Sequence, residues 1–188
     1  MNGIDTRRGG FTLIEMMLVI SIIGIIATIA IPTMLRLQLR AKSAECKANL
    51  AAILKAEEVY FAEYGTYVSA LPVRPALVGS QKQPWGLVPT ADHGFNRIGF
   101  APEGRLYFQY GATSNGALAL TIAARSDIDG DGIYNTWGLV KPVPNTGVGA
   151  AGPFGTCPVT GVFDPVTFAP NRMNTIGACD AASAATEY

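Results

Sequence analysis

The sequence predicts an α+β fold in which a long N-terminal helix packs on an antiparallel β-sheet. An apolar run, residues 11–35, continues into an amphipathic stretch that ends near residue 64. After residue 104, short segments rich in β-branched and aromatic residues alternate with turn residues, the pattern of an antiparallel meander. Because one face of such a sheet needs apolar cover, the amphipathic stretch is expected to supply it.

The apolar run is long enough to cross a membrane. As a helix, its 25 residues extend about 37 Å, more than the roughly 30 Å hydrocarbon thickness of a bilayer. A secretory signal usually has a shorter apolar core, about 7–15 residues, and a small-x-small cleavage site, which this run lacks. A plain anchor explains the length but gives no role to Glu15, whose carboxylate is costly in lipid unless something pairs with it.

Gly24 and Pro32 lie inside this run. Proline removes a backbone donor and crowds the preceding turn, so we expect the helix to bend or loosen near residue 28. In lipid such a break needs neighbouring partners, which helices packed side by side would supply.

The junction before the run carries the most specific pattern. A short basic leader ends in Gly10, Phe11 follows, and Glu15 is the fifth residue after the glycine. Together with Pro32 and the long apolar helix, this arrangement resembles the type IV pilin superfamily. The resemblance implies that a prepilin peptidase cuts between Gly10 and Phe11 and N-methylates Phe11.

A physical reason for this arrangement can be given from the residues themselves. The cut creates an α-amine at Phe11, which could neutralise Glu15 of a neighbouring subunit where water is excluded and so select the register of a polymer. Phe11, Glu15, Gly24 and Pro32 are therefore the candidate assembly residues. Glu15 merely reaching the lipid headgroups remains the alternative.

Four segments follow from the resemblance to pilins. Residues 1–10 are a leader that is removed, 11–35 a transmembrane or filament-core helix, 36–64 an amphipathic helix half, and 65–188 a globular head with the type IV pilin fold. The amphipathic half should turn one face to the head, with apolar residues at three- and four-residue intervals. These are Leu39, Cys46, Leu50, Ile53, Leu54, Tyr60, Phe61 and Tyr64.

Glycine and proline residues, which end helices and form turns, predict how the head is organised. Gly65 is the expected C-cap of the helix, and the proline-rich stretch 66–97 is expected to be a long wrapping loop. Strands are expected at 105–110, 117–123 and 133–140. Residues 98–104, which lead into the first strand, are similar to the equivalent stretch of myxobacterial major pilins, which extends the resemblance to about residue 140.

Three cysteines, Cys46, Cys157 and Cys179, allow three pairings. The pairing of Cys157 with Cys179 is favoured because it would close a coil-rich tail, a crosslink worth about 3 kcal/mol, and because many pilins have a C-terminal disulfide loop. Cys46 is then expected to be a small buried helix residue.

Asp127, Asp129 and Asp131 begin like a calcium-binding loop. The bidentate glutamate expected at the twelfth position is absent, because residue 138 is glycine. We interpret the segment as a turn between the second and third strands, with a calcium site as the alternative. No other cofactor is expected.

Charge and motifs argue against an enzyme or a nucleic-acid-binding protein. Lys plus Arg equals Asp plus Glu, 14 each, whereas a nucleic-acid surface usually shows a basic excess. The sequence has no P-loop, dinucleotide fingerprint or zinc pattern, and His93 is isolated in a Pro/Gly-rich loop. No catalytic residue and no specific nucleic-acid partner are predicted.

The sequence thus predicts a structural subunit of a type IV pilus. The resemblance implies a single-pass protein of the inner membrane, its head in the periplasm, which an assembly platform extracts into an extracellular filament of identical copies. Surface motility, adhesion or DNA uptake would follow from the family. A pseudopilin of a type II secretion system or a minor pilin is the first alternative, and a membrane-tethered adhesin that never polymerises is the second.

Orientation rests on the cysteines and the leader. Downstream of the run, Arg36, Arg40, Lys42 and Lys47 outnumber the two leader arginines, so the positive-inside rule alone would place the head in the cytoplasm. The predicted disulfide and the leader resemblance favour the opposite side.

Overall fold

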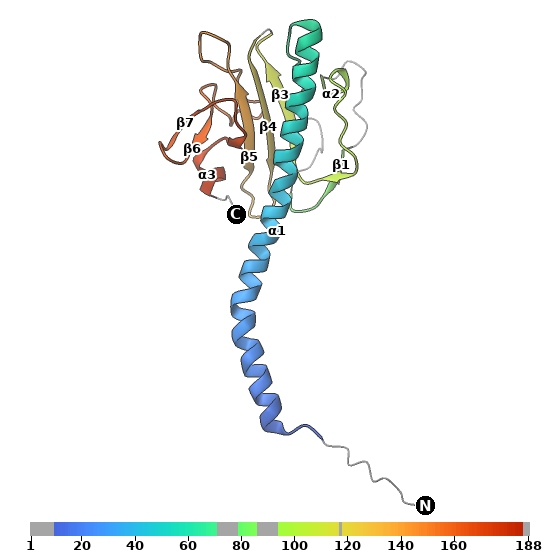
Figure 1. The fold of residues 1–188 in the computed structure, drawn as a ribbon, viewed down its shortest axis with the longest axis vertical. Coiled ribbons are helices and arrows are strands. Elements are labelled where there is room, and N and C mark those ends of the chain that lie inside the picture. Colours follow the sequence, from blue (N-terminus) through green and yellow to red (C-terminus); the bar gives the residue numbers. More distant parts are fainter. Residues whose placement is uncertain (1–9, 71–78, 86–93, 117, 186–188) are drawn as a thin grey trace, which may run out of the picture. The chain divides into compact units, whose positions relative to one another are not determined.

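The computed structural model describes residues 10–70, 79–85, 94–116 and 118–185. The chain divides into two compact units, Met1–Gln38 and Leu39–Tyr188, and helix α1 (Leu13–Tyr64) contributes to both (Figure 1). The predicted helix start at residue 11 is two residues too early, and the predicted end at residue 64 is confirmed.

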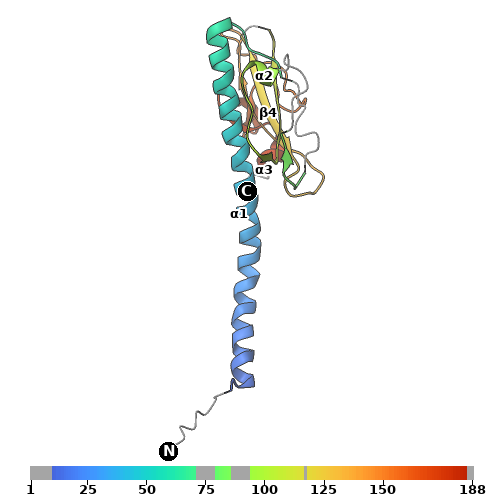
Figure 2. The same cartoon turned by 90° about the vertical axis from the view of Figure 1, so that its right-hand side faces the viewer.

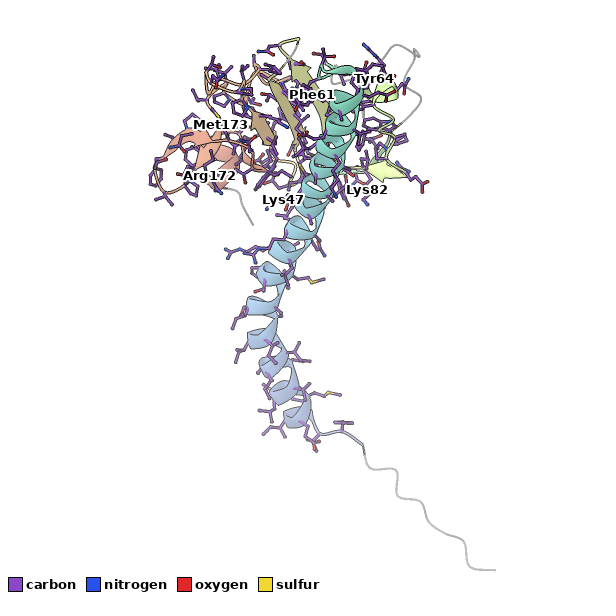
Figure 3. All side chains as sticks on the ribbon, turned by 45° about the horizontal axis from the view of Figure 1, so that its top comes forward. Lys47, Phe61, Tyr64, Lys82, Arg172 and Met173 are labelled. Carbon is purple, nitrogen blue, oxygen red and sulfur yellow. A yellow bond between two sulfur atoms is a disulfide. The ribbon has the colours of Figure 1, made fainter. Side chains whose placement is uncertain are left out.

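The first unit is the apolar part of α1. The helix continues through Gly24 and Pro32, and its side chains stand out around the ribbon (Figure 3). The hydroxyls of Ser21, Thr28 and Thr33 each donate to a backbone carbonyl three or four residues earlier, at 2.7–2.8 Å. Because these bonds use up the hydroxyl donors, the polar side chains are compatible with an apolar environment.

The second unit is built on a four-stranded antiparallel sheet in the order β3-β4-β5-β8 (Figure 1). Its strands are β3 (Gln109–Ser114), β4 (Leu120–Ser126), β5 (Asn135–Lys141) and β8 (Gly177–Ala178). Two smaller antiparallel pairs flank it, each with its own register. They are β1 (Gln83–Pro84) with β2 (Arg105–Leu106), and β6 (Val162–Asp164) with β7 (Ala169–Arg172).

The second half of α1 covers one face of this sheet, as expected (Figure 2). Leu50 and Ile53 of the helix and Tyr110, Ile122 and Leu139 of the sheet belong to one core cluster and are each at most 2% exposed. Burying apolar surface stabilises by about 25 cal/mol per Å², so this contact is a main source of the head's stability.

The bounds of all three predicted strands needed correction. The third, predicted over 133–140, is β5 (Asn135–Lys141). The segment 105–110 is not one strand, because the Tyr107 N–H donates to the Glu45 carboxylate of α1, at 2.9 Å, instead of to a neighbouring strand. The chain therefore breaks after β2 and pairs again as β3. The second strand starts at Leu120, three residues later than predicted, because β3 extends to Ser114, which pairs with Leu120.

The C-terminal tail is more structured than the sequence predicted. We expected coil, but the tail forms the β6–β7 hairpin, strand β8 and the short helix α3 (Ala181–Ala185). Strands of two to four residues are too short to show alternation, and the pairing of β8 with β5 is a tertiary contact.

The predicted wrapping loop 66–97 contains short elements of secondary structure among its described residues. It contains β1, the four-residue helix α2 (Gly94–Arg97) and an antiparallel bridge between Ala70 and Ala112. Pro72, Pro75, Pro89 and His93 lie outside the described residues.

The end of α1 confirms one prediction and corrects another. Gly65 has φ +70° and its N–H donates to the Phe61 carbonyl at 2.8 Å, as expected of a C-cap. Tyr64, expected on the core face, is 59% exposed. Cys46 is buried and free, as expected.

Glu57 is a buried carboxylate that the helical pattern did not reveal. Its side chain is 0% exposed, Oε2 accepts the Val68 N–H at 3.0 Å, and Oε1 has no hydrogen-bond partner among the described residues. Burial raises the pKa of Glu57 to about 7, although the hydrogen bond from Val68 acts in the opposite direction.

This raised pKa predicts a pH-dependent stability. Between pH 4.5 and about 7 the folded state binds the Glu57 proton and the unfolded state has lost it, so stability falls as pH rises through this window and levels off above it. The loss is about 3 kcal/mol. Urea unfolding of the detergent-solubilised chain at pH 5 and pH 8 measures it.

Glu57→Gln should remove most of this pH dependence, because glutamine does not ionise. Exposed Glu63 provides the control, since Glu63→Gln should leave the difference between pH 5 and pH 8 as in the wild type. Equal pH dependence in wild type and Glu57→Gln would contradict the assignment.

Candidate functional site

The N-terminus of α1 is closed by a reciprocal pair of side chains. The Glu15 N–H donates to Thr12 Oγ1 at 3.3 Å, and the Thr12 N–H donates to Glu15 Oε2 at 2.9 Å. Thr12 Oγ1 and Glu15 Oε2 are also hydrogen-bonded, at 2.6 Å. This is a capping box, which satisfies backbone donors that a helix leaves free at its start.

Sequence reasoning missed this role of Glu15. The signal was present, because Thr12-x-x-Glu15 before an apolar run is the pattern of a capping box. Among the described residues, the hydrogen bonds of the Glu15 carboxylate come from Thr12, which is neutral. No cationic side chain among the described residues therefore compensates the charge of the Glu15 carboxylate.

The predicted processing bond is accessible. Gly10 and Phe11 precede the first helical residue, and Phe11 is 77% exposed. No atom lies within 4 Å of a Cβ built on Gly10. The bond between them is therefore free of the helix and open to a protease.

The apolar side chains that follow are uncovered. Leu13 is 77% exposed and Ile29 is 71% exposed, and α1 contains a window long and apolar enough to cross a membrane. A groove of about 700 Å³ runs along one side of the helix between residues 25 and 37. Within this unit, the described residues provide nothing to fill it.

In the head, the structure confirms the disulfide between Cys157 and Cys179. The disulfide packs against β5 at Gly138, where an added Cβ would lie 2.6 Å from Cys157 Sγ and 3.0 Å from Cys179 Sγ. Glycine is required at 138 because any side chain would collide with the sulfurs. This position is also where a calcium loop would carry its glutamate.

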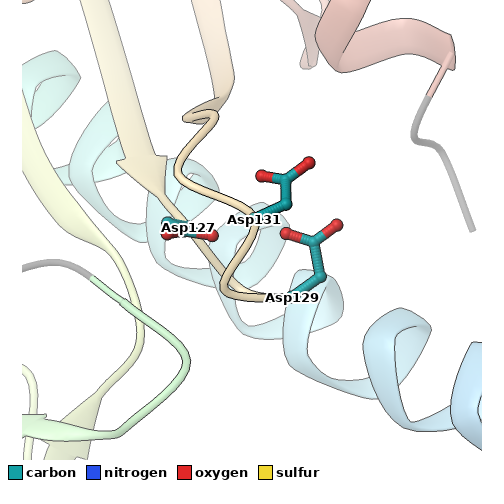
Figure 4. Close-up of side chains that lie close together, drawn as sticks. All are labelled: Asp127, Asp129 and Asp131. Atoms are coloured by element: carbon teal, nitrogen blue, oxygen red, sulfur yellow. The ribbon is translucent and has the colours of Figure 1, made fainter.

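Asp127, Asp129 and Asp131 do lie together, on the loop between β4 and β5 (Figure 4). Asp127 accepts the N–H groups of Gly130, at 2.7 Å, and Gly132, at 3.1 Å, and Asp131 accepts that of Ile133. These bonds are those of a turn, in which Gly130 and Gly132 have positive φ. One carboxylate oxygen of each aspartate nevertheless lies within 4.8 Å of the other two.

Comparison with known proteins identifies the class of the N-terminal region. Residues 5–31 match the family model described as the prokaryotic N-terminal methylation motif. The chain carries this motif, which confirms the resemblance read from Gly10, Phe11 and Glu15. The long helix, the antiparallel sheet and the C-terminal disulfide are consistent with the type IV pilin fold.

One relative can be named. The N-terminal region is similar to the type IV major pilin protein PilA of Myxococcus xanthus (strain DK1622), with 49% identity over 63 residues. The similarity covers 34% of this chain and 29% of that pilin, so the chain matches less than a third of the relative's length. The resemblance expected over 98–140 therefore stays a prediction. No solved structure gave a significant match.

The contact at Gly138 predicts a folding defect. Gly138→Ala should destabilise the head by about 1–3 kcal/mol and lower the fraction of chains with the disulfide, because the new methyl occupies the space of the sulfurs. Thermal unfolding and quantification of free thiols measure both effects.

Gly79→Ala is the matched control. No atom lies within 4 Å of a Cβ built on Gly79, and its φ is not in the left-handed region. Full disulfide formation with wild-type stability in Gly138→Ala would show that the packing argument is wrong.

Proposed function

We propose that this chain is the structural subunit of a type IV pilus, which polymerises through the apolar part of α1. The observation that carries the proposal is the uncovered apolar helix that directly follows a prokaryotic methylation motif. Water would penalise this surface by about 25 cal/mol per Å², so the segment needs lipid or other apolar helices around it. Lipid would cover this surface while the subunit is in the inner membrane, and the helices of other copies would cover it in the fibre.

The helix surface suits close packing with copies of itself. The groove along residues 25–37 can accept ridges of a second helix. Gly24 has no atom within 4 Å of a built Cβ, which leaves room for another backbone to approach. Pro32 leaves one carbonyl without its usual helical donor, a place where the helix can adapt when its surroundings change from lipid to protein.

Glu15 would select the register of this packing. After a prepilin peptidase cuts at Gly10, the Phe11 α-amine of one copy can pair with Glu15 of another, where the capping box already orients the carboxylate. An unpaired charge inside the bundle would cost about 3–5 kcal/mol. Registers that pair the amine with the carboxylate are therefore favoured over those that do not.

The same features support a compartment for the head. A disulfide between Cys157 and Cys179 forms and persists in an oxidising environment, which supports a periplasmic head before assembly and an extracellular one afterwards. The partners of this proposal are other copies of the chain, the prepilin peptidase and an assembly platform in the inner membrane. Similarity to a major pilin favours a pilus over the pseudopilin alternative.

Glu15→Gln tests the register role. Glutamine keeps a side-chain acceptor for the helix cap but has no charge for the neighbour's amine, so fibre yield should fall by roughly 100-fold while the subunit stays in the membrane. Electron microscopy and immunoblotting of sheared surface material measure the yield.

Thr12→Ala separates capping from register. It removes the other half of the capping box but leaves the Glu15 charge, so fibres should still form. Loss of fibres in Thr12→Ala to the same extent as in Glu15→Gln would contradict this separation and would mean that the helix cap itself is needed for assembly. Normal fibres in Glu15→Gln would contradict the register proposal, and unmethylated, uncut termini in mass spectrometry would contradict the processing step.

For the aspartate loop we propose a turn that needs no cation. Millimolar Ca²⁺ should then leave the melting temperature of the head unchanged, and Asp129→Asn should behave like the wild type. A calcium-dependent rise in melting temperature that Asp129→Asn abolishes would establish a calcium site instead.

A further inference from the structure

Two exposed arginines follow the apolar run of α1. Arg36 and Arg40 are four residues apart on a continuous helix, so their side chains leave the same face, one turn apart. Among the described residues, neither side chain has an ion pair or a hydrogen bond. The next acidic residue along α1, Glu45, is occupied, because it accepts the Tyr107 N–H at 2.9 Å and pairs with Lys82 at 3.8 Å. The two arginine charges are therefore available to a partner outside the described part of the chain.

The two lysines that come next on α1 differ from this pair, because the head uses both. Lys42 Nζ donates to the Ile128 carbonyl at 3.0 Å. Lys47, which Figure 3 shows on the helix, has its Nζ 4.4 Å from the centroid of the Trp137 ring. Contacts within the head thus account for these lysines and leave the arginines without a role.

The proposed orientation makes the two arginines costly. With the head in the periplasm, Arg36 and Arg40 lie on the side of the membrane where the positive-inside rule disfavours basic residues next to a span. They therefore work against the topology that the pilus subunit needs. A favourable contact of the two guanidinium groups on that side would offset this penalty.

The positions of the arginines along the helix match the depth of lipid phosphates. The helical part of the apolar run, residues 13–35, extends about 34 Å, and a slight tilt fits this length to the roughly 30 Å hydrocarbon thickness of a bilayer. Arg36 then comes at the edge of the hydrocarbon, and Arg40 comes about 6 Å farther along the helix. Each headgroup region is roughly 5–8 Å thick, so the pair spans the layer that contains the phosphates.

Arginine is chemically suited to this layer. Its guanidinium is planar and permanently charged, and it can hold a phosphate with two hydrogen bonds. The aliphatic stem can lie on apolar surface while the charged end reaches the headgroups. Anionic lipids attract basic residues next to a span, whereas a zwitterionic headgroup offsets its phosphate with a cation of its own. The partner that fits best is therefore the phosphate of an anionic phospholipid.

We propose that Arg36 and Arg40 bind the phosphates of anionic phospholipids while the subunit is stored in the membrane. The two contacts hold the helix at a fixed depth in the bilayer, with the apolar run in the hydrocarbon and the head outside it. Extraction of the subunit into a fibre then requires the release of these lipids. The inference rests on the proposed storage in the inner membrane and adds a lipid partner to it.

Lipid titration of the full chain in detergent tests the site. Native mass spectrometry gives the apparent dissociation constants for phosphatidylglycerol, which is anionic, and for phosphatidylcholine, which is zwitterionic. The wild type should prefer phosphatidylglycerol. Arg36→Gln should reduce this preference about 5-fold, and Arg36→Gln combined with Arg40→Gln about 30-fold, because each substitution removes one charge from the site.

Lys55→Gln is the matched control. It also removes a positive charge from an exposed position of α1, about 22 Å farther along the helix than Arg40, so the lipid preference should stay as in the wild type. Millimolar inorganic phosphate should not displace the bound phosphatidylglycerol, because the acyl chains of the lipid also pack on the apolar helix.

The outcomes separate this inference from the proposed function, because lipid binding is measured on the unassembled chain. The lipid site is overturned if the double variant keeps the wild-type preference, if Lys55→Gln loses as much, or if inorganic phosphate displaces the lipid. Fibres should still form in the double variant. Loss of fibres with an unchanged lipid preference would assign the arginines to a contact between copies and overturn the lipid site as well. A wild-type chain that binds phosphatidylglycerol but never forms fibres contradicts the proposed function alone.

Discussion

The structure of this chain depends on one constraint: the single helix α1 has two different apolar surfaces, and both must be buried. In the first unit, α1 is apolar on all sides, and no described residue of that unit covers it. In the second, the same helix is amphipathic and buries Leu50 and Ile53 in the core of the head. The head thus buries the apolar face of the amphipathic part of α1. Lipid or other chains must cover the part that is apolar on all sides.

Acidic side chains on α1 also organise the edges of the sheet. Glu45 accepts the N–H of Tyr107 where β2 ends, and Glu57 accepts the N–H of Val68 just before the bridge from Ala70 to Ala112. In both places the helix supplies the acceptor that a missing strand would have supplied. Burial raises the pKa of both carboxyls. The free energy of unfolding of the head therefore depends on pH through these two groups.

The disulfide has a similar influence on the opposite side of the sheet. Cys157 and Cys179 bring the C-terminal tail onto β5, and the sulfurs occupy the space above Gly138. This explains why the aspartate loop ends without the glutamate of a calcium site: the residue in that position has to be a glycine for the tail to pack. The loop is left as a tight turn whose outer carboxylates face away from the sheet.

The sequence by itself determined the elements whose signals are local or periodic. The membrane-length apolar run, the C-cap at Gly65, the β4–β5 turn and the N-terminal methylation motif all follow from neighbouring residues along the chain, and the Thr12–Glu15 cap could have been read in the same way. Only the tertiary structure decided the burial of Glu57, the break between β2 and β3 and the pairing of β8 with β5. Each of these depends on groups more than ten residues apart in the chain, and the free energy of such contacts is set by packing and desolvation, which leave no periodic trace in the sequence.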